Sequence, residues 1–154
     1  MRAVIQRVNK AICRVDGKIC GKCCFGLLIL LGVNQNDARS EAEILAEKIS
    51  KLRIFNDDED KMNLSVVDVC GEVLVISNFT LYADYSHGNR PAYFDSMEPV
   101  GANELYMYFV EKLREKVRSV ETGQFGAEMY IENELCGPVT IVMDSDILKK
   151  GKKK

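Results

Sequence analysis

Alternation of apolar and polar positions predicts that much of this chain is β-strand. Residues 3–16 alternate well enough for one long strand or two collinear ones, and Asp16-Gly17 then marks a hairpin turn from which residues 19–22 return. Residues 26–33 form an apolar run punctuated by glycine, which indicates a strand covered on both faces. Further strands are expected over residues 64–69, 72–79, 127–134 and 139–144.

Two segments show helical spacing instead. In residues 38–52 apolar side chains recur every three or four positions among charged ones, and Asp37 is a candidate cap. Residues 102–118 carry a similar stripe, formed by Leu105, Phe109, Val110, Leu113 and Val117. The chain has no internal repeat and no linker, so we expect a single domain over residues 1–148.

The strand expected at residues 72–79 ends in unusually polar residues. Ser77 shares one face with Phe79, while Asn78 and Thr80 lie on the other. A central strand that ends in hydroxyls and an amide is typical of a binding site, because rigid backbone delivers the polar groups to a cleft. This strand end is therefore a candidate site.

A second unusual feature is Gly137-Pro138, set between the last two expected strands. Proline cannot donate to a sheet ladder, so it marks a bulge, an edge or a bend. An ordinary turn between strands explains the local sequence most simply. The polar strand end at Ser77 favours the alternative, a corner that faces a ligand.

Charge is unevenly distributed along the chain. The net charge is −2, but five lysines lie within residues 149–154, and the remaining 16 basic residues face 23 acidic ones. An acidic body argues against a broad basic surface for nucleic acid. We expect residues 149–154 to be a disordered tail. No apolar run is long enough to span a membrane and the start lacks a signal peptide, so the cytoplasm is the expected location.

The residue types needed for metal or triad chemistry are sparse. Cys20-x-x-Cys23 has no second ligand pair, so we expect no metal and no cofactor, and six reduced, mostly buried thiols. His87 is the single histidine and lies in an irregular segment, residues 82–99. Hydroxyls, backbone N–H groups and the Gly-Pro corner remain, which are the parts of an oxyanion hole and a substrate clamp.

Six motifs in register carry a resemblance to a known family. They are Met1-Arg2-Ala3-Val4-Ile5-Gln6-Arg7-Val8, Lys61-Met62-Asn63-Leu64-Ser65, Ser77-Asn78-Phe79-Thr80-Leu81, Gly88-Asn89-Arg90-Pro91, Gly123-Gln124-Phe125-Gly126-Ala127-Glu128-Met129 and Gly137-Pro138-Val139-Thr140. Together they resemble the D-aminoacyl-tRNA deacylases, from residue 1 to about Ser145. The resemblance implies an α+β fold, with a mostly antiparallel, barrel-like sheet and two helices packed outside. It also implies a homodimer that hydrolyses the ester joining a D-amino acid, or glycine mischarged on the tRNA for alanine, to the 3′ end of tRNA.

The resemblance also implies roles for individual residues. The strand end of one subunit would face the Gly137-Pro138 corner of the other, whose carbonyls hold the amino group and exclude an L side chain. We expect this peptide bond to be cis. Thr80 and the Phe79 N–H would position substrate and stabilise charge, while the ribose 2′-OH activates water. The other expected substrate-binding residues are Ser77, Asn78, Phe125, Met129, Gly137 and Pro138, with Arg7 supporting the corner.

Two positions depart from the family pattern. Asn78 stands where the family has glutamine, and Leu135 where it usually has asparagine. The first puts one polar contact in doubt, and the second removes a support of the corner. Two alternative functions stay open: a non-catalytic nucleic-acid-binding relative and a general small-ester hydrolase.

Overall fold

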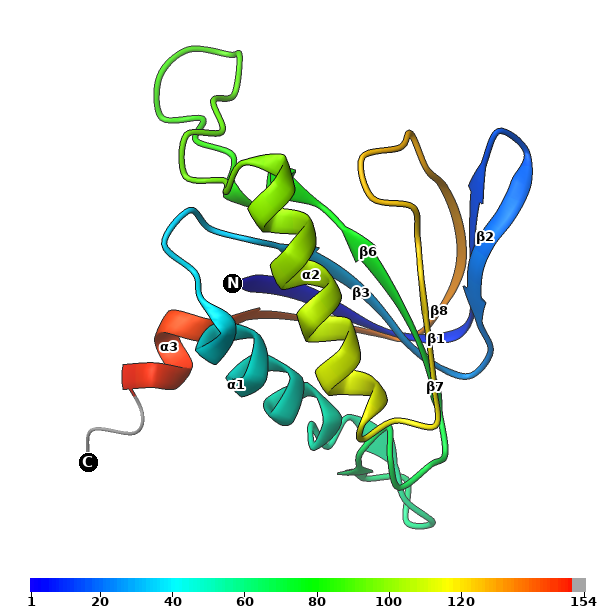
Figure 1. Ribbon diagram of the computed structural model, residues 1–154. Coiled ribbons are helices and arrows are strands. Elements are labelled where there is room, and N and C mark those ends of the chain that lie inside the picture. Colours follow the sequence, from blue (N-terminus) through cyan, green and yellow to red (C-terminus); the bar gives the residue numbers. More distant parts are fainter. Residues whose placement is uncertain (151–154) are drawn as a thin grey trace.

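The computed structural model describes residues 1–150. Its strands, in chain order, are β1 (Arg2–Val15), β2 (Lys18–Cys23), β3 (Gly26–Gly32), β4 (Phe55–Asn56), β5 (Met62–Leu64), β6 (Glu72–Ser77), β7 (Ser119–Thr122) and β8 (Tyr130–Asp144). Its helices are α1 (Arg39–Ser50), α2 (Pro99–Arg114) and α3 (Ser145–Lys150), with a short 3₁₀ helix η1 (Phe79–Tyr82) after β6 (Figure 1). None of the described helices is both long and apolar enough to cross a membrane.

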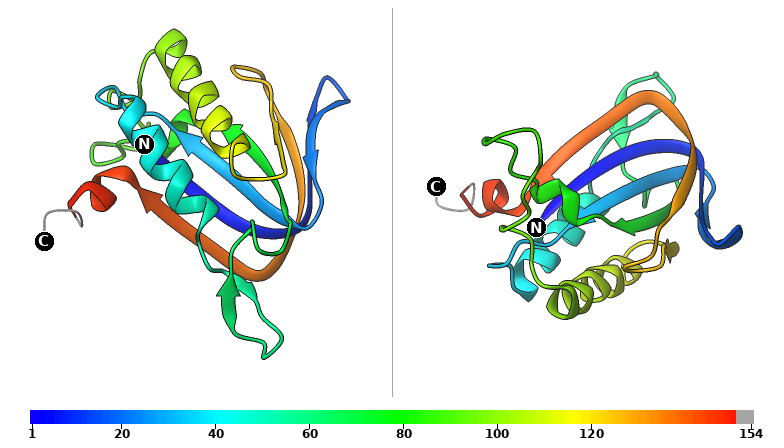
Figure 2. Two further views of the ribbon diagram at one scale, coloured as in Figure 1. Left: turned by 60° about the horizontal axis from the view of Figure 1, so that its bottom comes forward. Right: turned by 90° about the horizontal axis from the view of Figure 1, so that it is seen from above.

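Strand β1 organises the sheet. Its first half pairs with β3 and its second half with β2, while β8 runs along its other edge, all antiparallel. The sheet continues from β3 through β6 to β7 by parallel pairings. It curls strongly (Figure 2), and β2 comes back towards β7, where the Lys22 N–H donates to Glu121 Oε2 at 2.8 Å. The expected barrel-like α+β fold is confirmed, with two parallel pairings in a sheet that is otherwise antiparallel.

Helices α1 and α2 lie side by side across one face of the curved sheet (Figures 1 and 2). The apolar stripe of each helix is buried there: Ile49 of α1 and Phe109 of α2 are both fully buried, as are Ile5 of β1 and Ile29 of β3. Burying a side chain of this size contributes about 1.5–3 kcal/mol. The periodic spacing in the sequence therefore predicted both the helices and the face that each one buries.

The segment from Ser65 to Cys70 is a turn, and the strand predicted at residues 64–69 is wrong. Only Leu64 belongs to a strand, β5. The Ser65 N–H and hydroxyl both donate to Asp68 Oδ2, and the Val69 N–H donates to the Ser65 carbonyl. Local hydrogen bonds from Ser and Asp side chains offer the backbone an alternative to a sheet ladder. This explains why the apolar residues alone wrongly predicted a strand here.

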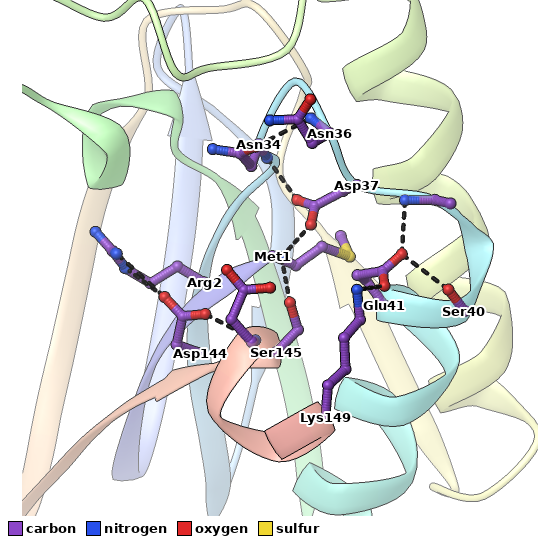
Figure 3. Close-up of polar contacts among 12 residues, drawn as sticks. Met1, Arg2, Asn34, Asn36, Asp37, Ser40, Glu41, Asp144, Ser145 and Lys149 are labelled. Atoms are coloured by element: carbon purple, nitrogen blue, oxygen red, sulfur yellow. Dashed lines mark hydrogen bonds and ion pairs between the residues drawn. The ribbon is translucent and has the colours of Figure 1, made fainter. Parts of the chain in front are cut away.

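The N-terminus is tied down beside α3 (Figure 3). The buried Met1 ammonium lies 2.5 Å from Asp37 Oδ1 and 2.6 Å from Ser145 Oγ. Asp37 also accepts from the Asn34 N–H, so its carboxylate serves the N-terminus and does not cap α1 as predicted. Ala38 occupies the cap position, and its N–H donates to Glu41 Oε2 at 2.8 Å.

Helix α3 was not predicted from the sequence, and it docks on α1 through an ion pair (Figure 3). Lys149 Nζ contacts Glu41 Oε1, whose carboxylate is almost fully buried. Lys149 and Lys150 therefore belong to a helix, whereas a disordered tail was expected from residue 149. The remainder of that expected tail, residues 151–154, lies outside the described residues.

Glu41→Gln is expected to lower the free energy of unfolding near neutral pH, and to lower it less as the pH falls below about 4.5. Burial raises the pKa of Glu41, but hydrogen bonds from Lys149, the Ala38 N–H and Ser40 outweigh burial and bring the pKa from 4.5 to about 2. A carboxylate whose pKa is lower in the folded state contributes its full stability above the unfolded pKa. That contribution is lost as the pH falls towards the folded pKa.

Urea denaturation of wild type and variant from about pH 7 down to about pH 2.5 measures this difference. Glu43→Gln is the control, because Glu43 lies exposed on the same helix. If the free energies of unfolding of Glu41→Gln and wild type differed by the same amount at every pH in this range, the lowered pKa of Glu41 would be contradicted.

Candidate active site

A pocket of about 580 Å³ opens beside the C-terminal end of β6. Residues from β3, β6, the segment after η1, α2 and the loop before β8 line it: Leu31, Val33, Ser77, Asn78, Phe79, Tyr93, Ser96, Met97, Pro99, Ala102, Tyr106, Phe125, Gly126, Ala127 and Met129. Most of these side chains are apolar, and the polar ones come mainly from the end of β6. A largely apolar cavity with a few convergent polar groups is the usual form of a small-molecule site.

The polar edge of the pocket is built by the transition from β6 to η1. The Asn78 N–H donates to the Leu31 carbonyl at 2.8 Å, which holds the strand end against β3. The Asn78 side chain then caps η1: its Oδ1 accepts from the Thr80 N–H at 3.2 Å and from the Thr80 hydroxyl. Asn78 in place of glutamine was expected to put one polar contact in doubt, and its shorter side chain makes a local cap that fixes Thr80.

Phe79 lies at the pocket mouth with its side chain 58% exposed. Its ring makes an edge contact with Tyr93, at 4.9 Å between centroids. The Ser96 hydroxyl donates to the Phe79 carbonyl at 3.0 Å. Both partners come from the irregular segment 82–99, which therefore supports the strand end.

The inner wall of the pocket is aromatic and apolar. Tyr106 of α2 is buried, donates to the Val75 carbonyl at 2.8 Å and lies 5.9 Å from the Phe125 ring, between centroids. Burial raises the pKa of Tyr106 well above its usual value, so the hydroxyl stays a donor. Gly123 allows Met129 to close the wall, because a Cβ there would meet Met129 Sδ at 2.6 Å.

The Gly137-Pro138 corner is a large irregularity in the ladder between β1 and β8. Leu135 pairs with Val8 and Thr140 pairs with Gln6, so the four residues Cys136–Val139 lie opposite the single residue Arg7. The peptide bond before Pro138 is cis, as the sequence predicted, and Gly137 has φ +127°. Both corner residues are exposed.

Arg7 supports this corner from beneath. Its guanidinium is buried and donates to the Cys136 carbonyl at 3.1 Å, to the Ile54 carbonyl at 2.7 Å and to Asn56 Oδ1 at 3.1 Å. Three hydrogen bonds from one planar guanidinium fix the backbone that leads into the corner. Leu135, whose presence was expected to remove a support of the corner, is 42% exposed, and Arg7 holds the adjacent Cys136 carbonyl.

Within one chain the corner and the pocket are separate. None of Arg7, Gly137 and Pro138 lines the pocket. Through the sheet register, Ser77 aligns with Leu31 and Ala3, so Arg7 lies four residues farther along the strands. That is about 13 Å along the strand direction, with β8 three strands across from β6.

The structure thus brings together five of the predicted site residues: Ser77, Asn78, Phe79, Phe125 and Met129. Thr80 follows them on the exposed side of η1. The sequence prediction missed Tyr93, Ser96 and Tyr106. The irregular segment 82–99 gave a general signal for the first two. Tyr106 lies on the buried face of α2 but was not among the residues of the predicted stripe.

Hydroxyl, amide and backbone groups are the polar groups that this site offers. Over residues 1–150, no group of three or more His, Cys, Asp or Glu side chains is placed to hold a metal ion. Among the described residues the hydrogen-bond partner of the Thr80 hydroxyl is an amide oxygen, which is not a general base. Nucleophilic catalysis by Thr80 would need such a base.

Comparison with solved structures defines the class of fold. The structure of a probable eukaryotic D-amino acid tRNA deacylase superposes with a TM-score of 0.77 at 15% identity, over 92% of this chain and 97% of its own, so the two share a fold. The c-Myc DNA Unwinding Element Binding Protein superposes with a TM-score of 0.89 at 36% identity, over 94% of this chain and 98% of its own.

Sequence comparison then gives the family. The family model for D-Tyr-tRNA(Tyr) deacylase matches residues 4–144. D-aminoacyl-tRNA deacylases from Thermosipho melanesiensis and Koribacter versatilis are each 55% identical to this chain, over 146 and 145 residues, which in both cases is 94% of this chain and 97% of the relative. The chain belongs to the D-Tyr-tRNA(Tyr) deacylase family. The predictions of this family and of a hydrolase of this class are confirmed.

Proposed function

We propose that this protein hydrolyses the ester bond between a D-amino acid and the 3′ end of tRNA, releasing the free D-amino acid. Glycine mischarged on the tRNA for alanine would be a second substrate. The observation that carries the proposal is the apolar pocket beside the end of β6, where strand-end polar groups converge. Such a proofreading enzyme would act in the cytoplasm, on the tRNA pool used in translation.

The pocket residues form an apolar wall and a polar edge. Phe125 and Met129 line the apolar wall, while Ser77 and Asn78 bring polar groups to its edge. Phe79 is the first residue of η1, where helix N–H groups have no partner within the helix. We assign its N–H to the developing negative charge on the ester carbonyl oxygen.

The Gly137-Pro138 corner would complete the site from a second copy of the chain. In one chain the corner is exposed and lies away from the pocket. In a two-fold dimer each subunit offers its corner to the partner's pocket and receives one in return. Carbonyls of the corner then accept hydrogen bonds from the substrate ammonium, and charge-assisted bonds of this kind are strong. Arg7 holds the corner in place through Cys136.

Thr80→Val is expected to slow hydrolysis by roughly tenfold and to leave no acyl-enzyme behind. The substitution keeps the shape of the side chain but removes the bond from the hydroxyl to Asn78 Oδ1, so η1 loses part of its cap. Single-turnover kinetics measure the change, with mass spectrometry of the quenched enzyme. Complete loss of activity, or an aminoacyl group trapped on Thr80 in the wild type, would make Thr80 the nucleophile.

Hydrolysis of D-tyrosyl-tRNA, L-tyrosyl-tRNA and p-nitrophenyl acetate by the purified protein tests the function. We expect the D ester to be cleaved at least about tenfold faster than the L ester, because a backbone clamp excludes the L side chain sterically. A general small-ester hydrolase would cleave all three substrates. A non-catalytic nucleic-acid-binding protein, which the likeness to a protein named for DNA binding keeps in view, would cleave none.

A further inference from the structure

The hairpin of β1 and β2 brings two thiols into contact. Cys13 on β1 and Cys20 on β2 have their Sγ atoms 3.3 Å apart, and the Cys20 thiol also lies 3.4 Å from the Cys13 carbonyl oxygen. Both residues are free thiols. Neither belongs to the candidate active site.

An irregularity in the hairpin register makes this contact. Arg14 pairs with Ile19 and Cys13 pairs with Gly21, so Cys20 is the one extra residue on β2 between these two pairs. A bulge of this kind re-aims a side chain that regular alternation would direct elsewhere. The fold thus places Cys20 beside Cys13 although they are not direct cross-strand partners.

The two thiols differ in access. Cys20 is exposed, whereas Cys13 is fully buried. Burial, together with the hydrogen bond and the charge interaction with Cys20, raises the pKa of Cys13 to about 12. An oxidant from solvent therefore meets the exposed Cys20 first, and the buried Cys13 thiol lies in contact with it.

We propose that Cys13 and Cys20 form a reversible oxidation site that responds to peroxides. Cys20 sulfur attacks one peroxide oxygen, the O–O bond breaks, and Cys20 becomes a sulfenic acid with release of water. Cys13 sulfur then attacks the Cys20 sulfur, its proton leaves with the hydroxyl as a second water, and a disulfide forms. Two thiols and one hydrogen peroxide thus give one disulfide and two waters. The sulfurs need to approach by only about 1.2 Å to reach bonding distance.

The neighbouring cysteines are less suited to this reaction. The buried Cys23 points its thiol at the Leu27 carbonyl, at 3.7 Å. Cys24 and Cys70 are exposed, and no thiol hydrogen bond joins either to another cysteine among the described residues. Three of the six thiols, including Cys20, are therefore exposed, and the expectation of mostly buried thiols is wrong.

Mass spectrometry can locate the cross-link without ambiguity. Trypsin cleaves after lysine and arginine, so Cys13 falls in residues 11–14 and Cys20 in residues 19–22, each alone, while Cys23 begins the next peptide. The folded protein is treated with hydrogen peroxide, its remaining thiols are alkylated under denaturing conditions, and it is digested. We expect the peptides 11–14 and 19–22 joined and lacking two hydrogen atoms, and a thiol reductant should separate them.

Three variants sharpen the test. Cys20→Ser should leave Cys13 a free thiol after peroxide, because the accessible partner is gone. Cys13→Ser should let Cys20 proceed to sulfinic acid, since no resolving thiol is present. Cys24→Ser, just past the end of β2, should still form the cross-link. A cross-link from Cys20 to Cys23 or Cys24, or wild-type Cys20 oxidised to sulfinic acid without a disulfide, would overturn the proposal.

Discussion

Gly137→Ala is expected to lower the rate of D-aminoacyl-tRNA hydrolysis by about 100-fold or more while the protein stays folded. Gly137 has φ +127°, a region in which L side chains are strained. A Cβ at this position would lie 2.8 Å from the Val139 nitrogen and 3.3 Å from Arg7 Nη2. The corner therefore has to move, and its carbonyls move with it. Because the corner is exposed, the core loses no packing.

Gly17→Ala is the matched control for this variant. Gly17 also has positive φ, +75°, but a Cβ there meets nothing within 4 Å, and Gly17 does not line the pocket. Both variants carry backbone strain of about 1–3 kcal/mol, and only Gly137→Ala displaces the corner. Deacylation kinetics and thermal unfolding of both proteins separate the two effects. Equal losses of activity in the two variants would remove the corner from the mechanism.

Most of the sheet and both long helices follow from periodicity. The alternation over residues 3–16 and the apolar run over residues 26–33 become β1 and β3 with ends shifted by one residue or less. These elements are predictable because each buries a regular set of side chains, and burial imposes the pattern that the sequence displays.

The elements that escaped prediction are held by specific contacts. Strand β7 has only four residues, too few for an alternating pattern to be recognised in the sequence. Its position is set by parallel pairing with β6. Helix α3 docks on α1 through the ion pair between Lys149 and Glu41, which lie 108 positions apart in sequence. Pairings of this kind are fixed by the tertiary structure, and the local sequence does not specify them.

Some residues of the candidate site could likewise be predicted from the local sequence, and others could not. Ser77, Asn78 and Phe79 were predictable because polarity at the end of a central strand is a local signal. Tyr106 was not, because a tyrosine inside a predicted helix is compatible with simple core packing until its hydroxyl is seen to donate to the Val75 carbonyl. The separation of Arg7 from the pocket also needed the strand register.

The central claim is that one active site draws on two subunits, and a mixed dimer tests it most directly. Phe79→Pro serves as the pocket variant, because it removes the N–H assigned to the developing charge. Proline is tolerated at the first position of a helix, and Asn78 already has the extended conformation that precedes proline. Loss of one such donor costs about 100- to 1,000-fold in rate. Phe79→Ala keeps the N–H and controls for the ring.

The measurement is the hydrolysis of D-tyrosyl-tRNA by a purified heterodimer of Phe79→Pro and Gly137→Ala subunits, with affinity tags at the C-terminus so that the Met1 ammonium keeps its contact with Asp37. Each homodimer should be nearly inactive. In the heterodimer one site carries both substitutions and the other carries neither, so about half of the wild-type rate per dimer should return. A heterodimer as inactive as the two homodimers, or a wild-type protein that is fully active as a monomer, would contradict the shared site.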